Sequence, residues 1–229
     1  CSACGGGRDF HRKYFGRRGV AVKSPAGQAE DISRLMSAGF GRIQFPLDPI
    51  GSDRYWLEML AQLERRRLRP VMKVELCGLP SRKFLGAFAA SAPGSRVTVF
   101  AGSGSERVRR LNRGRFYTNA ALMGTLRAAA RLGVTMWVTF TTGLPFETRD
   151  DLRATAGLIR RMRREFGVNL AGVYVFSVEP GSPVFEAINT PATFDVRRGA
   201  SIGAAARLTA CQSECSAHSP TSRTNLATS

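Results

Sequence analysis

Apolar and polar residues alternate in five short runs along the chain, and an amphipathic segment separates each run from the next. The runs are rich in β-branched and aromatic residues and cover residues 42–47, 71–76, 96–101, 135–140 and 172–178. Such a run is typical of a β-strand, whereas apolar residues spaced three and four apart are typical of a helix. The regular alternation of the two patterns predicts a parallel α/β sheet.

The predicted helices have recognisable ends. One helix begins after Ser24-Pro25 and ends at Gly39, and a second covers residues 55–67. A third begins at Thr148, where an acidic residue three positions later resembles a capping box, and ends at Gly167. These limits place a loop after each strand.

The alternation within the strands separates two faces of the predicted sheet. The apolar positions are Ile43, Phe45, Leu47, Met72, Val74, Leu76, Met136, Val138, Phe140, Tyr174, Phe176 and Val178. The opposite positions include Gln44, Lys73, Glu75 and Thr139. Strands of a parallel sheet that is covered on both sides are normally apolar throughout. The polar face therefore predicts a curved sheet around a solvated or ligand-filled lumen; the alternative is a sheet with one wet face.

The charge and composition leave the class of a soluble enzyme as the default. The net charge of +17 suggests affinity for polyanions, but 30 of the 34 basic residues are scattered arginines. We therefore interpret the charge as mainly compositional and expect RNA to bind weakly. No run of 18 apolar residues and no signal peptide is visible, which predicts a cytoplasmic protein without a membrane span.

Five cysteines at irregular spacing argue against a secreted disulfide scaffold. Cys1 and Cys4 form a Cys-x-x-Cys pair that runs into three glycines, which suits a thiolate-bound metal or cluster on a loop. Two alternatives are a thioredoxin-like redox pair and a zinc site completed by Cys211 and Cys215.

The loops at the predicted carboxyl ends of the strands carry polar residues. Asp48 follows the first run, Gly102-Ser103-Gly-Ser105 follows the third, and Glu179 follows the fifth. In a barrel-like array of strands and helices, ligands bind at this edge. The glycine and serine segment also precedes a helix, so its amides and hydroxyls would suit a carboxylate or a ribose.

Taken together, these segments resemble the radical S-adenosylmethionine (radical SAM) enzymes, in particular the subclass associated with a cobalamin-binding domain. Cys1 and Cys4 match the last two ligands of the Cys-x3-Cys-x2-Cys cluster loop. Residues 103–114, 142–148 and 179–183 are similar to the family's segments after its fourth, fifth and sixth strands. The resemblance covers about residues 1–188.

The resemblance implies a partial (β/α)6 barrel, similar to a TIM barrel, with parallel strands and a polar lumen. It also implies that the first strand and the first cluster cysteine lie upstream of this chain, so we expect the chain alone to be inactive. Residues 1–188 are then the radical SAM core domain. From Thr209 onward 9 of 21 residues are Ser or Thr, and residues 189–229 are predicted to be a disordered tail.

The same resemblance implies a chemistry. Cys1, Cys4 and an upstream cysteine would hold a 4Fe-4S cluster, and Asp48, Ser103, Ser105 and Glu179 would lie near S-adenosylmethionine. An electron from an external donor would then produce a 5′-deoxyadenosyl radical that modifies a small-molecule or lipid-like substrate. Methyl transfer or cyclisation with cobalamin in a longer parent chain is a further expectation.

Three alternatives remain open at this point. One is a radical SAM methylthiotransferase that modifies tRNA. Another is a non-catalytic basic module that binds RNA, which would need basic residues gathered on one face with exposed aromatics. The third is an inactive fragment.

Overall fold

The protein forms one parallel sheet of five strands whose spatial order equals their order in the chain. The structure, a computed structural model, describes residues 8–17, 21–46, 53–112, 116–167 and 171–188. The strands are β1 (Arg42–Phe45), β2 (Val71–Leu76), β3 (Arg96–Gly102), β4 (Thr135–Thr142) and β5 (Ala171–Val175). The fold class is therefore α/β, as the alternating pattern predicts.

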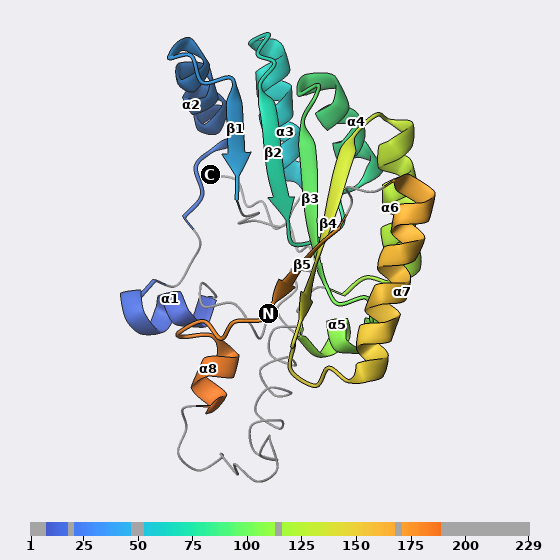
Figure 1. The fold of residues 1–229 in the computed structure, drawn as a ribbon. Helices are drawn as coiled ribbons and strands as arrows, with labels where there is room; N and C mark the ends of the chain where they lie inside the picture. Colours follow the sequence, from blue (N-terminus) through green and yellow to red (C-terminus); the bar gives the residue numbers. More distant parts are fainter. Residues whose placement is uncertain (1–7, 18–20, 47–52, 113–115, 168–170, 189–229) are drawn as a thin grey trace, which may run out of the picture.

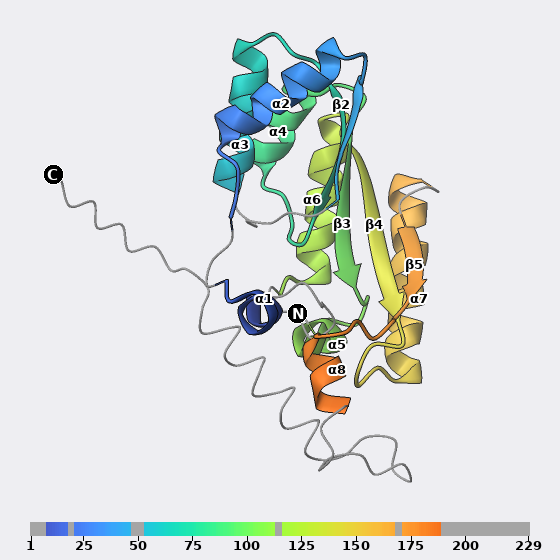
Figure 2. The same ribbon diagram turned by 90° about the vertical axis from the view of Figure 1, so that its left-hand side faces the viewer.

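The eight described helices are α1 (Arg8–Phe15), α2 (Pro25–Ser37), α3 (Asp53–Arg65), α4 (Arg82–Ser91), α5 (Glu106–Asn112), α6 (Asn119–Arg131), α7 (Arg149–Phe166) and α8 (Pro183–Ile188). Of these, α2, α3, α4, α6 and α7 cover the outer side of the curled sheet (Figures 1 and 2). Figure 1 shows α1, α5 and α8 at the end of the sheet toward which the strands point. The result is a partial TIM-like barrel.

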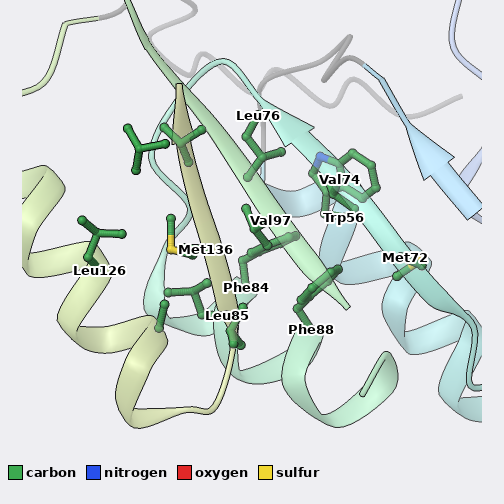
Figure 3. Packing of buried hydrophobic residues seen from close by; sticks show 14 of the residues in the cluster. Trp56, Met72, Val74, Leu76, Phe84, Leu85, Phe88, Val97, Leu126 and Met136 are labelled. Atoms are coloured by element: carbon green, nitrogen blue, oxygen red, sulfur yellow. The ribbon is translucent and has the colours of Figure 1, made fainter. Parts of the chain in front are cut away.

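The hydrophobic core lies between the outer face of the sheet and the helices (Figure 3). Alternate residues of β2 face this core, so that Met72, Val74 and Leu76 are at most 4% exposed. Trp56 of α3 and Phe84 of α4 pack edge to face at 6.3 Å between ring centroids. Burial of these large side chains on one face of each element explains why the amphipathic segments fold as helices over a sheet.

The pattern of two faces is confirmed in β2 and β4 but is wrong in β5. The parallel register pairs Tyr174 with Thr141 and Val173 with Phe140, so Tyr174 lies on the polar face. Val173 and Val175, which share the outer side with Phe140, are 57% and 81% exposed. The strand is at the edge of the sheet, where both faces are exposed, so its alternation does not identify the buried side.

Two further predictions from the sequence, the tail and the alternative zinc site, involve residues that the structure does not describe. The proposed tail, residues 189–229, lies outside the described residues, and so do Cys211 and Cys215. Within the described part of the chain, no helix has both the length and the apolar character that crossing a bilayer requires.

Candidate functional site at the inner face and carboxyl edge

The inner face of the sheet, which points away from the core helices, carries rows of polar side chains. Residues in register on neighbouring parallel strands share a face, so the strand pairings define these rows. The rows are Gln44, Lys73, Arg96 and Thr135; then Glu75, Thr98 and Trp137; then Phe100, Thr139 and Gly172. The polar face expected from the sequence is thus present across β1 to β4.

Several of these side chains contact one another. The Lys73 ammonium lies 2.6 Å from a carboxylate oxygen of Glu75. The Gln44 amide donates to the same oxygen at 3.3 Å. The guanidinium of Arg96 lies 3.7 Å from the ring centroid of Trp137. These contacts hold charged groups in place on the inner face.

Two hydroxyl groups at the centre of the inner face are buried without a partner. Thr98 and Thr139 are 3% and 5% exposed. Among the described residues, neither of their Oγ1 atoms has a hydrogen-bond partner. A buried hydroxyl without a partner costs about 1–3 kcal/mol, and such groups are normally met by water or a ligand. The inner face is therefore suited to a polar ligand.

Ser103 and Ser105, both predicted near the cofactor, lie in the turn between β3 and α5. Their hydroxyls face α7: the Ser103 Oγ lies 3.2 Å from Oγ1 of Thr155, and the Ser105 hydroxyl donates to Asp151 at 2.6 Å. The amides of this turn, which the sequence predicts to suit a ligand, have partners at three positions. The Ser103 amide donates to the Ala101 carbonyl at 3.0 Å. The Gly104 amide donates to the Thr155 hydroxyl, and the Ser105 amide donates to the Ser103 hydroxyl. Contact of either serine with a cofactor stays a prediction.

Gly104 is required by a close approach of two backbones. A Cβ atom on this residue would lie 2.4 Å from Cα of Thr155 and 3.1 Å from its nitrogen. Both neighbours are backbone atoms of α7, which cannot rotate away. The glycine therefore lets the turn after β3 contact the first half of α7, a role that the sequence pattern does not reveal.

Asp151 connects this turn to the beginning of α7. It completes the predicted capping box with Thr148, and it accepts a hydrogen bond from Arg107 at 2.5 Å. The hydrogen bond from Arg107 holds the pKa of Asp151 well below its usual range, with further contributions from Ser105 and Thr148. The carboxylate therefore stays charged at neutral pH and fixes two loops at the carboxyl edge.

Arg109 is a fully buried member of the same network. Its Nη2 donates to the Ser103 carbonyl at 2.8 Å and to the Asn119 side chain at 2.5 Å. Its Nη1 donates to the Tyr117 carbonyl at 2.5 Å. The side-chain amide of Asn119 in turn donates to the Gly104 carbonyl at 2.8 Å. One guanidinium thereby organises the backbone on both sides of α5.

Glu147 provides a second group without a complete set of partners, at the carboxyl end of β4. The Gly143 amide donates to its Oε2 at 2.6 Å. Its Oε1 is buried and has no hydrogen-bond partner among the described residues. This oxygen has unused acceptor capacity, which a ligand hydroxyl or amine would reach only after the groups that cover it move. The sequence motif includes Glu147, but no pattern singles it out.

Helix α1 is attached to α8 at the same end of the sheet (Figures 1 and 2). Lys13 forms an ion pair with Glu186 at 3.0 Å, and the Tyr14 hydroxyl donates to the same carboxylate at 3.2 Å. The hydrogen bond from Lys13 lowers the pKa of Glu186. A Cβ on Gly181 would lie 2.1 Å from the Phe10 ring, so the two segments also pack tightly. The segment that follows the cysteine pair is thus fixed beside the segment after β5.

The other predicted site residues are placed as follows. Cys1, Cys4 and Asp48 lie outside the described residues. Glu179 is exposed, and its carbonyl accepts from the Ser182 amide at 3.0 Å. Cys77 is half-buried after β2. Within the described ranges, no group of three or more His, Cys, Asp or Glu side chains is placed to hold a metal ion.

The comparisons with known proteins give similarities to solved structures only. No family model and no curated protein matches the chain. A solved structure of coproporphyrinogen III oxidase from Escherichia coli, described as a radical SAM enzyme, is similar with a TM-score of 0.49 and 12% identity. The match covers 85% of this chain and 48% of that one, so this chain spans about half of its length. At this level the similarity does not assign a function.

We predict that Gly104→Ala destabilises the fold by about 3 kcal/mol, near the upper end of the usual cost of overpacking, because the added methyl meets α7 backbone. Gly124→Ala is the matched control. It lies in α6, and a Cβ there would meet nothing within 4 Å, so we expect a neutral or slightly stabilising effect. Urea denaturation measures both. An unchanged midpoint for Gly104→Ala would show that the turn does not depend on this contact.

We predict that Asp151→Asn lowers stability by about 1–3 kcal/mol at pH 7. Because the folded pKa is lowered, the contribution of the carboxylate is present above its unfolded pKa of about 3.9 and is lost as the pH falls below that value. The difference between variant and wild type should therefore shrink at pH 3. The control is Asp150→Asn, since this exposed carboxylate pairs only on the surface with Arg153. An equal loss of stability in Asp151→Asn, relative to the wild type, at pH 7 and at pH 3 would contradict the prediction.

Proposed function

We propose that the chain is part of a radical SAM core, which binds S-adenosylmethionine on the inner face and at the carboxyl edge. The observation that carries this proposal is the pair of buried hydroxyls on Thr98 and Thr139, which have no partner among the described residues. The motifs of the cysteine pair and of the strand ends, which resemble this enzyme family, indicate which ligand the face receives.

The inner face and the carboxyl edge together have groups that suit this ligand. S-adenosylmethionine carries an amine, a carboxylate and ribose hydroxyls, which need both acceptors and donors. The Oε1 atom of Glu147 offers an acceptor at the end of β4. The hydroxyls of Thr98 and Thr139 can act as either donor or acceptor. Their fixed positions on strands would hold the ligand in one orientation.

The cluster would be held by Cys1, Cys4 and one cysteine upstream. The observation that supports this part is the attachment of α1, which follows the cysteine pair, to α8 through Phe10 and Lys13. This attachment brings the segment after the pair to the same end of the sheet as the strand-end motifs. A 4Fe-4S cluster held there would supply the electron for cleavage of S-adenosylmethionine. Cobalamin, the external electron donor and a small-molecule or lipid-like substrate are further proposals from the same resemblance.

The network around Arg109 and Asp151 has a supporting role in this proposal. It fixes the turn after β3 and the start of α7 before any ligand binds. A rigid edge lowers the entropy cost of positioning a substrate C–H bond. The hydroxyls of Ser103 and Ser105 belong to this network, so contact with S-adenosylmethionine would use other atoms of the turn or require these hydroxyls to exchange partners.

We predict that a chain extended upstream to include the third cysteine binds iron and sulfide after anaerobic reconstitution. The double variant Cys1→Ala, Cys4→Ala should lose most of the iron and the electron paramagnetic resonance signal of the reduced cluster. Cys77→Ala is the matched control, because Cys77 lies outside the motif, and should retain both. Formation of 5′-deoxyadenosine, normalised to iron, measures the activity. Full iron loading of the double variant would refute the assignment of Cys1 and Cys4.

We further predict that Thr98→Val and Thr139→Val each raise the stability of the protein but weaken its binding of S-adenosylmethionine. Each change removes a buried hydroxyl without a partner while keeping the shape, so the unliganded protein should become more stable by about 1 kcal/mol. Binding of S-adenosylmethionine to the reconstituted extended chain should weaken about tenfold, equivalent to one lost hydrogen bond of about 1.4 kcal/mol.

Thr135→Val is the control for this pair. Its side chain is exposed on the same face, so neither quantity should change. Titration calorimetry and urea denaturation measure the two effects. A loss of stability in the valine variants would show that the hydroxyls serve the fold and not a ligand.

A further inference from the structure

A recess lies at the end of the inner face where β1, β2 and β3 begin, opposite the carboxyl edge. It has a volume of about 460 Å³, and its lining includes Arg42, Gln44, Val71, Lys73, Gly94 and Arg96. The strand-end motifs lie at the carboxyl edge, so this recess belongs to neither the cysteine segment nor the turn after β3. Among the described residues, no carboxylate side chain lines it.

The recess gathers positive charge. Lys73 and Arg96 are register neighbours on β2 and β3, and like charges on adjacent strands are unfavourable. Arg42 lies on the same face of β1, two residues before Gln44. The carboxylate beside the recess, Glu75, is already bound to Lys73 and Gln44. No ion pair within the described part of the chain involves either arginine.

Arg96 is held in a fixed orientation with donor capacity left over. Its guanidinium lies 3.7 Å from the ring centroid of Trp137. Its Nε is buried and has no hydrogen-bond partner among the described residues. A planar guanidinium fixed on an aromatic ring presents its N–H groups to an oxyanion in a defined geometry. This Nε atom has essentially no accessible surface, so a ligand in the recess would meet the terminal N–H groups of Arg96, which form no hydrogen bond within the described part of the chain. Donors without a partner inside a cationic recess point to an anionic ligand.

We propose that this recess binds the phosphate group of a small phosphorylated molecule. Lys73 is neutralised by Glu75, which leaves two guanidiniums for the ligand. A phosphate monoester carries close to two negative charges at neutral pH and has three acceptor oxygens, whereas a carboxylate carries one charge and has two. The phosphate therefore matches both the charge and the number of donors. The site is built from residues other than those of the proposed radical SAM site and does not depend on that proposal.

Titration calorimetry of the unreconstituted 229-residue chain with inorganic phosphate, at an ionic strength fixed with chloride, tests the site. We expect saturable binding that shifts the indole NMR signal of Trp137. Arg96→Gln and Arg42→Gln should each weaken binding at least tenfold, because each removes one of the two unneutralised cations. Arg96→Lys, which keeps the charge but not the fork, should fall between Arg96→Gln and the wild type.

Arg82→Gln is the matched control, because Arg82 is an exposed cation on α4 away from the recess and its loss should leave the affinity unchanged. Near-UV circular dichroism checks that each variant is folded. If Arg96→Gln does not fold, the exposed Arg42 still provides the test.

Equal affinities in Arg42→Gln and wild type, or no saturable phosphate binding by the wild type, would overturn the proposal. Tight binding of an RNA oligonucleotide that is unaffected by either arginine variant, with no phosphate binding, would also overturn it and assign the charge to a nucleic-acid surface. Neither iron nor S-adenosylmethionine is present, so the outcome is independent of the proposed reaction.

Discussion

The contact between the turn after β3 and the backbone of α7 is the constraint on which the carboxyl edge depends. Gly104 can approach Thr155 only because it has no Cβ. This approach lets the hydroxyls and amides of the turn exchange hydrogen bonds with Thr155 and Asp151. Arg109 then secures the turn from the other side through the Ser103 carbonyl. Two loops that are distant in sequence thereby become one rigid unit.

This rigid unit explains how the sheet can leave its inner face open. Within the described part of the chain, the main core lies between the outer face and the helices, and a small second cluster contains Val184, Ala187 and Phe176. The inner face adds little apolar burial to the stability of the fold. The edge is held instead by buried polar bonds, which are strong where every partner is satisfied. Among the described residues, three of the buried polar atoms without a partner, on Thr98, Thr139 and Arg96, lie elsewhere on the inner face, and the fourth, Oε1 of Glu147, lies at the edge itself. Satisfied polar groups thus support the scaffold, whereas the inner face and its edge keep buried polar atoms that no described residue satisfies.

Much of this arrangement is encoded locally and could be predicted from the sequence. The strands β2 and β4 follow from alternation, because each buries one face against helices. The same rule fails for Tyr174, since an edge strand has no buried face to enforce the pattern. The direction of the Ser103 hydroxyl depends on where α7 packs, which no local pattern encodes. Arg109 lies among other arginines in the sequence and is distinguished from them only by its burial in the tertiary structure. The predicted ligands Cys1, Cys4 and Asp48 lie outside the described residues.

The parallel direction of the strands gives the two ends of the inner face different chemistry. The carboxyl ends continue into loops, and loops can supply carboxylates such as Glu147 and hydroxyls at many angles. The amino ends carry side chains that project from the strands themselves, and there the charge of Arg42, Lys73 and Arg96 is fixed by the register. The large positive charge of the chain therefore has one local consequence that its scattered arginines would not suggest. Because a register cannot slip by one residue without moving every side chain to the other face, the cationic recess is maintained by the same constraint that maintains the core.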